Sequence, residues 1–237
     1  MKSGHLLITG VGRRAGLHLA RCFTARGQPV IGTFRSVSPG IEELRSAGVE
    51  LYCCDFHRPA DVDRLIRSVR SAHQDLRAVI HNASQWMRDG DGSSDVDTIE
   101  AMMRVHVNVP YVLNRALAPL LRAAPKKSAD IIHVGDYVSS RGSAKHMAYA
   151  ASKAAQDNLT LSFAQQLAPH VKVNSIAPAL LLFNEDDDAE YRAKACAKSL
   201  MQREGGFDEL QQAVDYLMNS RYVTGRILPL DGGRHLR

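Results

Sequence analysis

Short runs of aliphatic and β-branched residues alternate with longer amphipathic stretches along almost the whole 237-residue chain. This alternation is typical of parallel strands joined by helical crossovers, so it predicts a doubly wound α/β fold: a seven-stranded parallel sheet with helices on both faces. The predicted strands are Leu6–Ile8, Val30–Phe34, Val49–Tyr52, Ala78–His81, Ile131–Val134, Lys172–Ile176 and Arg226–Leu230. The predicted helices cover residues 14–26, 41–47, 59–72, 95–122, 147–168, 188–201 and 208–219. No repeat or low-complexity segment interrupts this order, and we therefore expect one domain over residues 1–237.

Composition argues against several classes of function. No run approaches the roughly 20 apolar residues that a membrane span needs, so no membrane association is expected. The four cysteines form no C-x-x-C pair, and the ten histidines show no ligand spacing, which favours a reducing cytoplasm and no bound metal. A net charge of +5 could suggest nucleic acid, but the lysines and arginines are scattered and no aromatic-interleaved basic stripe is present. An anionic small molecule accounts for the charge as well.

A glycine-rich turn follows the first predicted strand. It reads Thr-Gly10-Val-Gly12-Arg-Arg-Ala-Gly16 and opens a helical stretch. Glycines allow the backbone to approach a pyrophosphate, and the free N–H groups at a helix start favour its negative charge. Alone, such a turn could be an ordinary strand-to-helix connection. Its place between the first strand and a helix favours a Rossmann-like dinucleotide site.

The end of the second predicted strand indicates which dinucleotide binds. NAD-binding folds usually place an acidic residue there for the ribose 2′-hydroxyl, but this chain has Arg35 and no acid before Glu42. With Arg13 and Arg14 in the preceding turn, Arg35 can hold a 2′-phosphate, so the sequence predicts NADPH. The alternative is three solvated surface arginines. Asp55, after the third strand, either accepts from the adenine amino group or starts a helix.

Tyr149 and Lys153 lie four residues apart within a predicted helix. This spacing puts both side chains on one face, where the ammonium is expected to stabilise a phenolate and lower the tyrosine pKa. The tyrosine then becomes a usable proton donor. Out of context, the pair could equally be two surface residues.

In context, the whole chain resembles the short-chain dehydrogenase/reductase superfamily. The resemblance covers the glycine turn, Asn82-Ala83-Ser84 after the fourth strand, Asn108, the Tyr149/Lys153 pair, Pro178 after the sixth strand, and Thr224-Gly225 through Asp231-Gly232-Gly233. It implies that Lys153 binds the nicotinamide ribose and that Asn108 orders a water relay. It also implies that residues 82–84 and Pro178 contact the cofactor, and that the chain forms a homotetramer in which the tail, residues 234–237, could reach a neighbour's active site.

Three departures from the superfamily pattern point to a subgroup. Arg14 stands where glycine is usual, Asp136 replaces the usual serine thirteen residues before the tyrosine, and Ser84 replaces a glycine and is followed by Gln85-Trp86. The arginine and the aspartate resemble the pteridine reductases. In that family the pterin lies between the nicotinamide and an aromatic side chain, which implies that role for Trp86, although a half-buried core tryptophan is the alternative. Arg14 is then expected at the pterin or the cofactor phosphates.

Asp136 suits a pterin better than a ketone. A carboxylate beside a developing oxyanion would oppose carbonyl reduction, where serine is the usual donor. In a dihydropterin the reacting bond is C=N, so hydride goes to C6 and a proton must reach N5, for which a carboxyl group is a reasonable source. We expect Asp136, Tyr149, Lys153 and Asn108 to be catalytic, with Arg14, Trp86, Asp136 and Tyr149 at the substrate. Dihydrofolate shares the ring, and a carbonyl or enoyl reductase or a non-catalytic NADPH-binding regulator remain alternatives.

Overall fold

The computed structural model describes residues 4–125 and 129–237. Seven strands form one parallel sheet, as the sequence predicted, and the structure gives their order as β3-β2-β1-β4-β5-β6-β7. The strands are β1 His5–Ile8, β2 Val30–Phe34, β3 Glu50–Cys53, β4 Leu76–His81, β5 Ala129–Val134, β6 Val171–Pro178 and β7 Ile227–Leu230. The helices are α1 Arg14–Ala25, α2 Pro39–Ser46, α3 Pro59–Ala72, α4 Asp95–Met103, α5 Val109–Arg122, α6 Met147–Leu167, α7 Ala189–Cys196 and α8 Phe207–Asn219.

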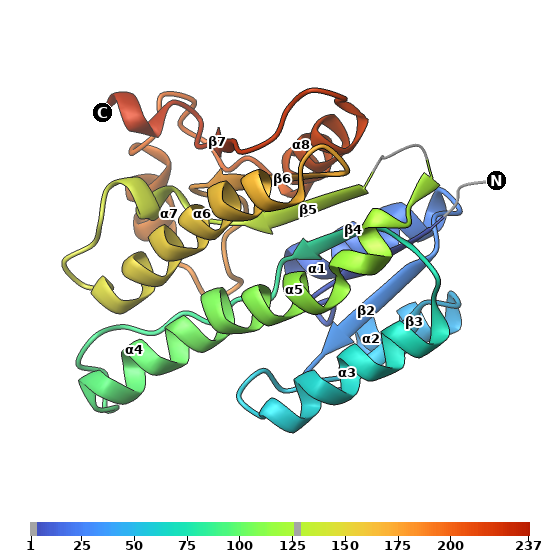
Figure 1. Ribbon diagram of the computed structural model, residues 1–237. Coiled ribbons are helices and arrows are strands. Elements are labelled where there is room, and N and C mark those ends of the chain that lie inside the picture. The colour runs from blue at the N-terminus through green and yellow to red at the C-terminus, as the bar shows by residue number, and fades with distance from the viewer. Residues whose placement is uncertain (1–3, 126–128) are drawn as a thin grey trace.

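Two helical layers cover the sheet. Helices α3, α5 and α6 lie on one face, toward the viewer in Figure 1, and their apolar sides pack on a core that includes Leu7, Leu113 and Phe163. Helices α1, α2 and α8 cover the other face around Leu19 and Leu217. Because the chain leaves β1 toward β2 but re-enters the sheet at β4 on the other side of β1, a crevice is expected at the carboxyl ends of these strands.

Two predicted helices differ from those observed. The stretch 95–122 is interrupted by a π-helical turn, Arg104–Asn108, between α4 and α5. Pro110 follows directly, and because proline has no N–H it cannot donate to the carbonyl four residues back. The helix predicted over residues 188–201 ends at Cys196. No residue of α7 is buried, and the amide of Met201 donates to the carbonyl of Gly232 at 3.1 Å and not to a carbonyl of the helix.

Within the described ranges, no helix is long and apolar enough to cross a membrane.

Candidate active site

The glycine turn is held against the end of β4. The side-chain amide of Asn82 donates to the carbonyls of Thr9 at 3.0 Å and Gly10 at 3.1 Å. A Cβ at Gly10 would lie 2.8 Å from the Cα of Ala83, and one at Gly16 would lie 2.1 Å from the carbonyl oxygen of Gly10. Both positions therefore require glycine, and the turn packs tightly where the crevice begins.

A different environment surrounds Gly12 and the arginines beside it. The nearest atom to a Cβ built at Gly12 is 3.8 Å away, and the Gly12 carbonyl accepts a 2.8 Å bond from the Ser38 hydroxyl, which ties the turn to the loop after β2. Arg13 and Arg35 are exposed, and in residues 4–125 and 129–237 neither guanidinium is paired with a carboxylate. An open glycine backbone with two unpaired guanidinium groups fits the pyrophosphate and 2′-phosphate of NADPH.

Arg14 reaches across the crevice. It has a positive φ of 50°, and its guanidinium donates to the carbonyl of Leu182 at 2.6 Å and to the side-chain oxygen of Asn184 at 3.0 Å. Its side chain thus joins the glycine turn to the loop after β6, about 170 residues later. Whether it also contacts the pterin or the cofactor stays a prediction.

Two predicted cofactor residues lie at the carboxyl ends of their strands. Asp55 accepts a 3.0 Å bond from the amide of His57 in the turn before α3, and its contact with adenine stays a prediction. Pro178 is buried as the last residue of β6.

The predicted catalytic residues Asp136, Tyr149 and Lys153 come together at the carboxyl end of β5. The Tyr149 hydroxyl donates to Oδ2 of Asp136 at 2.8 Å, while Oδ1 of Asp136 accepts the amide of Val138 at 2.8 Å and so caps a 3₁₀ turn. The ammonium of Lys153, 1% exposed, donates to the carbonyl of Val134 at 2.9 Å and lies 5.8 Å from the centre of the Tyr149 ring.

The electrostatics of this group differ from the sequence prediction. Burial, and then the charge and hydrogen bond of Asp136, raise the pKa of Tyr149, whereas Lys153 was expected to lower it. Burial lowers the pKa of Lys153 to about 8. The prediction was wrong because it considered only the ammonium of Lys153, four residues along the helix. It left out the desolvation of the Tyr149 phenol and the nearby carboxylate of Asp136. The site therefore holds Tyr149 as a protonated phenol that points at a carboxylate.

Asn108 does not join this group. It is exposed at the end of the π-helical turn, while His106, two residues earlier, is fully buried with its ring edge-on to Tyr149 at 5.4 Å between centroids. Sequence reasoning treated His106 as structural. The buried positions Met102, His106 and Val109 recur at helical spacing and could have identified the inward face, on which Asn108 does not lie.

His106 connects the loop after β4 to α6. Its Nε2 lies 2.9 Å from the Ser84 hydroxyl and accepts the amide of Gln85 at 3.3 Å, so Nδ1 carries the proton and donates to the Ser152 hydroxyl at 2.8 Å. Burial and the nearby Lys153 ammonium lower the pKa of His106 to about 2, which keeps the ring neutral. Ser84 lies close enough to Tyr149 to lower the pKa of the phenol, against the larger effects of burial and Asp136 that raise it.

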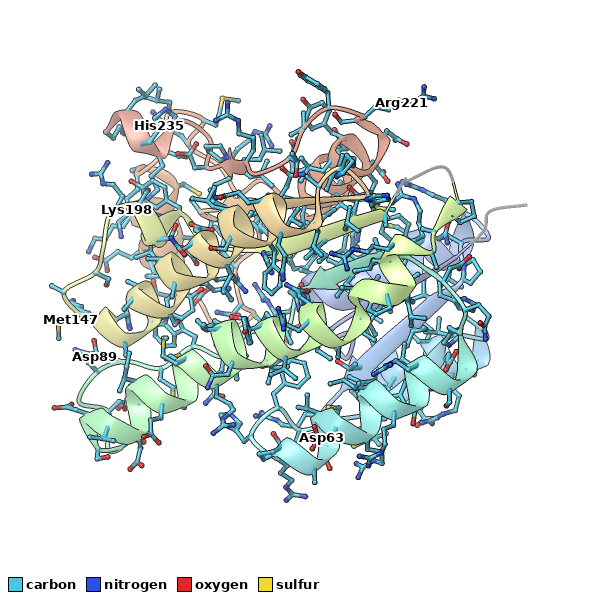
Figure 2. All side chains as sticks on the ribbon, in the orientation of Figure 1. Asp63, Asp89, Met147, Lys198, Arg221 and His235 are labelled. Carbon is cyan, nitrogen blue, oxygen red and sulfur yellow. The ribbon has the colours of Figure 1, made fainter. Side chains whose placement is uncertain are left out.

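Trp86 lies on the loop between β4 and α4. It is 62% exposed, and its ring centroid is 4.4 Å from that of His146, so it is not the core tryptophan of the alternative interpretation. The loop is fixed to the start of α6 by Asp89, whose carboxylate accepts the amides of Met147 and, at 3.3 Å, Ala148; Asp89 and Met147 are neighbours in Figure 2. A free aromatic face on an anchored loop is suited to stack on a flat ring.

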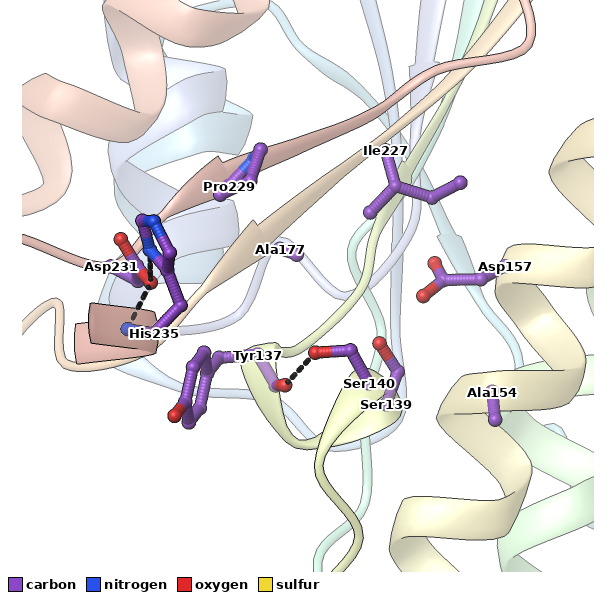
Figure 3. Close-up of a pocket in the computed structure, with 10 residues that line it drawn as sticks. All are labelled: Tyr137, Ser139, Ser140, Ala154, Asp157, Ala177, Ile227, Pro229, Asp231 and His235. Atoms are coloured by element: carbon purple, nitrogen blue, oxygen red, sulfur yellow. Dashed lines mark hydrogen bonds and ion pairs between the residues drawn. The ribbon is translucent and has the colours of Figure 1, made fainter. Parts of the chain in front are cut away.

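A separate cavity of about 330 Å³ lies behind the 3₁₀ turn, between α6 and the carboxyl-terminal tail. Figure 3 shows Asp157 on one side of it and His235, bonded to Asp231, on the other. Neither Tyr149 nor Lys153 lines it.

Comparisons with known proteins agree with this geometry. A family model described as enoyl-(acyl carrier protein) reductase matches residues 10–235. The chain is 54% identical to a dihydromonapterin reductase of Escherichia coli strain SMS-3-5 over 98% of this chain and 97% of that protein. Among solved structures, FolM alternative dihydrofolate reductase 1 from Brucella canis, complexed with NADP, has a TM-score of 0.86 at 26% identity and covers 100% of this chain and 95% of its own. The RhlG/NADP complex from Pseudomonas aeruginosa has a TM-score of 0.88 at 25% identity, with 99% of this chain and 97% of its own covered.

Proposed function

Since the chain belongs to the short-chain dehydrogenase/reductase family, we propose that it is an oxidoreductase that reduces 7,8-dihydromonapterin to 5,6,7,8-tetrahydromonapterin with NADPH. The full-length similarity to dihydromonapterin reductases supports the substrate. The NADP complexes among the structural relatives, together with the unpaired Arg13 and Arg35, support the cofactor.

The observation that carries the proposal is the 2.8 Å bond from the Tyr149 hydroxyl to Asp136. A carboxylate at this place would repel a developing alkoxide, but it can relay a proton to a ring nitrogen. The pair therefore favours a C=N bond over a C=O bond as the reacting group.

The residues divide into three roles in this proposal. Bound NADPH supplies the hydride that goes to C6. Lys153 would hold the nicotinamide ribose, and the Asp136/Tyr149 pair would deliver a solvent proton to N5, so that the C=N bond gains one hydride and one proton. Trp86 covers the outer face of the pterin and excludes water from it.

We assign to His106 the position in the relay that the sequence gave to Asn108. Because it stays neutral, it does not shuttle protons as an imidazolium; it accepts the Ser84 hydroxyl and so fixes the position of Ser84 beside Tyr149. His106 is therefore a positioning residue.

The test is an NADPH-oxidation panel with dihydromonapterin, dihydrobiopterin, dihydrofolate and simple ketones, with NADH as the control. We expect turnover with dihydromonapterin and NADPH. Oxidation with ketones alone would overturn the assignment. Dihydrofolate is a second candidate substrate, because one structural relative is named an alternative dihydrofolate reductase.

We also propose a homotetramer in the reducing cytoplasm. The cytoplasm is supported by the four cysteines, all of which are free. The tetramer rests on the family resemblance, and light scattering of the purified protein tests it, since a monomeric mass would remove it.

A further inference from the structure

Three ligand-type side chains meet at the amino end of the sheet, at the opposite ends of the strands from the active site. His5 begins β1, Glu50 begins β3, and His73 directly follows α3. One ligand atom from each lies within 4.8 Å of the others. Their positions, 5, 50 and 73, show no motif spacing, so sequence reasoning that looked for helical or C-x-x-C spacing could not find this His5–Glu50–His73 cluster.

The atoms are arranged around a common point. Nε2 of His73 lies 3.0 Å from Oε2 of Glu50, yet among the described residues this buried nitrogen has no hydrogen-bond partner, because the contact lacks hydrogen-bond geometry. The two imidazole rings are 4.3 Å apart between centroids and inclined at 54°. Two ligands of a tetrahedral ion with bonds of about 2.0–2.1 Å are separated by about 3.3 Å, close to the observed contact.

The cluster is also held in place by its surroundings. The Tyr52 hydroxyl donates to Oε1 of Glu50, which leaves Oε2 turned toward His73. The backbone of His5 is paired with β4 and that of Glu50 with β2, and the amide of His73 donates to the Val69 carbonyl at the end of α3. The side chain of His73 is only 9% exposed, against 35% for Glu50, so the group opens to solvent on the carboxylate side. Hydrogen bonds that orient a ligating carboxylate are typical of metal sites.

From this geometry we propose that His5, Glu50 and His73 bind one Zn²⁺ ion. Two imidazoles and one carboxylate form a ligand set that suits zinc and not Ca²⁺ or Mg²⁺, which prefer all-oxygen sites. A water molecule on the exposed side completes four-coordination. The ion links β1, β3 and α3 at the edge remote from the crevice, so its effect is on stability and not on turnover.

The experiment measures zinc on the chelator-treated full-length protein. Equilibrium dialysis against ZnCl₂ should give one tightly bound zinc per chain, and saturating Zn²⁺ should raise the melting temperature by roughly 5–10 °C, whereas Mg²⁺ should not. X-ray absorption should show only nitrogen and oxygen ligands. The His73→Gln variant should bind one zinc fewer; Glu50→Gln, at a more exposed position, provides the same test if the first variant folds poorly.

A matched control replaces a histidine that lies near other ligand-type atoms elsewhere in the fold. Nε2 of His18 lies 3.5 Å from Sγ of Cys22 and 3.2 Å from Oδ1 of Asp208, so His18→Gln removes the competing ligand. The proposal holds if the zinc stoichiometry falls by one in the His73 or Glu50 variant and is unchanged in His18→Gln. Any other result overturns it, including the absence of bound zinc or a sulfur ligand in the absorption spectrum.

Discussion

The hydroxyl of Tyr149 points at a carboxylate, Asp136, over 2.8 Å. Burial and that carboxylate raise the pKa of the phenol, so Tyr149 remains protonated across the physiological range. In the proposed reaction the proton for the substrate therefore comes from the Tyr149/Asp136 pair as a unit. Substitution of either residue tests the role of both.

Replacing Asp136 with serine should remove the carboxyl while keeping a side chain that can cap the 3₁₀ turn. We expect kcat for the dihydropterin to fall by about 10²-fold, the scale of a lost proton-transfer group, with the KM for NADPH nearly unchanged. Steady-state kinetics with each substrate varied would check both values. Unaltered dihydropterin turnover would contradict the proposed role of Asp136.

Truncation of His106 to alanine should lower kcat by roughly 10-fold, because the Ser84 hydroxyl beside the Tyr149 phenol loses its anchor. His106→Asn keeps a hydrogen-bonding side chain and should recover part of the loss. The pH profile of kcat should shift in the alanine variant, which a purely structural defect would not produce. Asn108→Ala, on the exposed side of the same turn, is the control and should retain full activity.

Trp86→Ala is expected to raise the KM for the pterin about 3–10-fold, since an aromatic stack contributes about 0.5–1.5 kcal/mol beyond its buried area. Because the side chain is 62% exposed, the melting temperature should not change. Trp86→Phe keeps a ring and should restore most of the affinity. A loss of stability in place of a change in KM would mean that the ring serves packing.

Arg35→Ala should raise the KM for NADPH by about 10–100-fold and leave that for NADH unaltered, because only the phosphorylated ribose offers an anion to the guanidinium. Arg45, an exposed arginine of α2 paired with Glu42, provides the matched control. Equal effects of the Arg35 substitution on both cofactors would remove the assignment of the 2′-phosphate site.

The sequence predicted the sheet more successfully than the site, for physical reasons. Strands buried on both faces, such as Val30–Phe34, appear as short runs rich in aliphatic, β-branched and aromatic residues, and the limits of these runs can be read from the sequence. The direction of a side chain cannot be read from such runs. Within one helical stretch His106 points inward and Asn108 outward, and a π-helical turn shifts the register between α4 and α5. Contacts such as that from Arg14 to Leu182 depend on the completed fold.

Three buried histidines should make the protein sensitive to acid. Burial lowers the pKa of His81 from 6.5 to about 4 and that of His106 to about 2, and it lowers the pKa of His133 well below 6.5. In the unfolded chain each of these side chains takes up a proton near pH 6.5, while the folded protein does not, so the unfolded state binds more protons and the free energy of unfolding falls as the pH drops below 6.5.

Each such histidine contributes a slope of about 1.4 kcal/mol per pH unit between its two pKa values. Urea denaturation from pH 7.5 to 4.5 should show this fall in the wild type. His81→Gln should have a shallower slope, by about one proton, whatever its stability at pH 7.5, because only the number of protons taken up sets the slope. A curve for His81→Gln parallel to that of the wild type would mean that His81 is charged in the folded state.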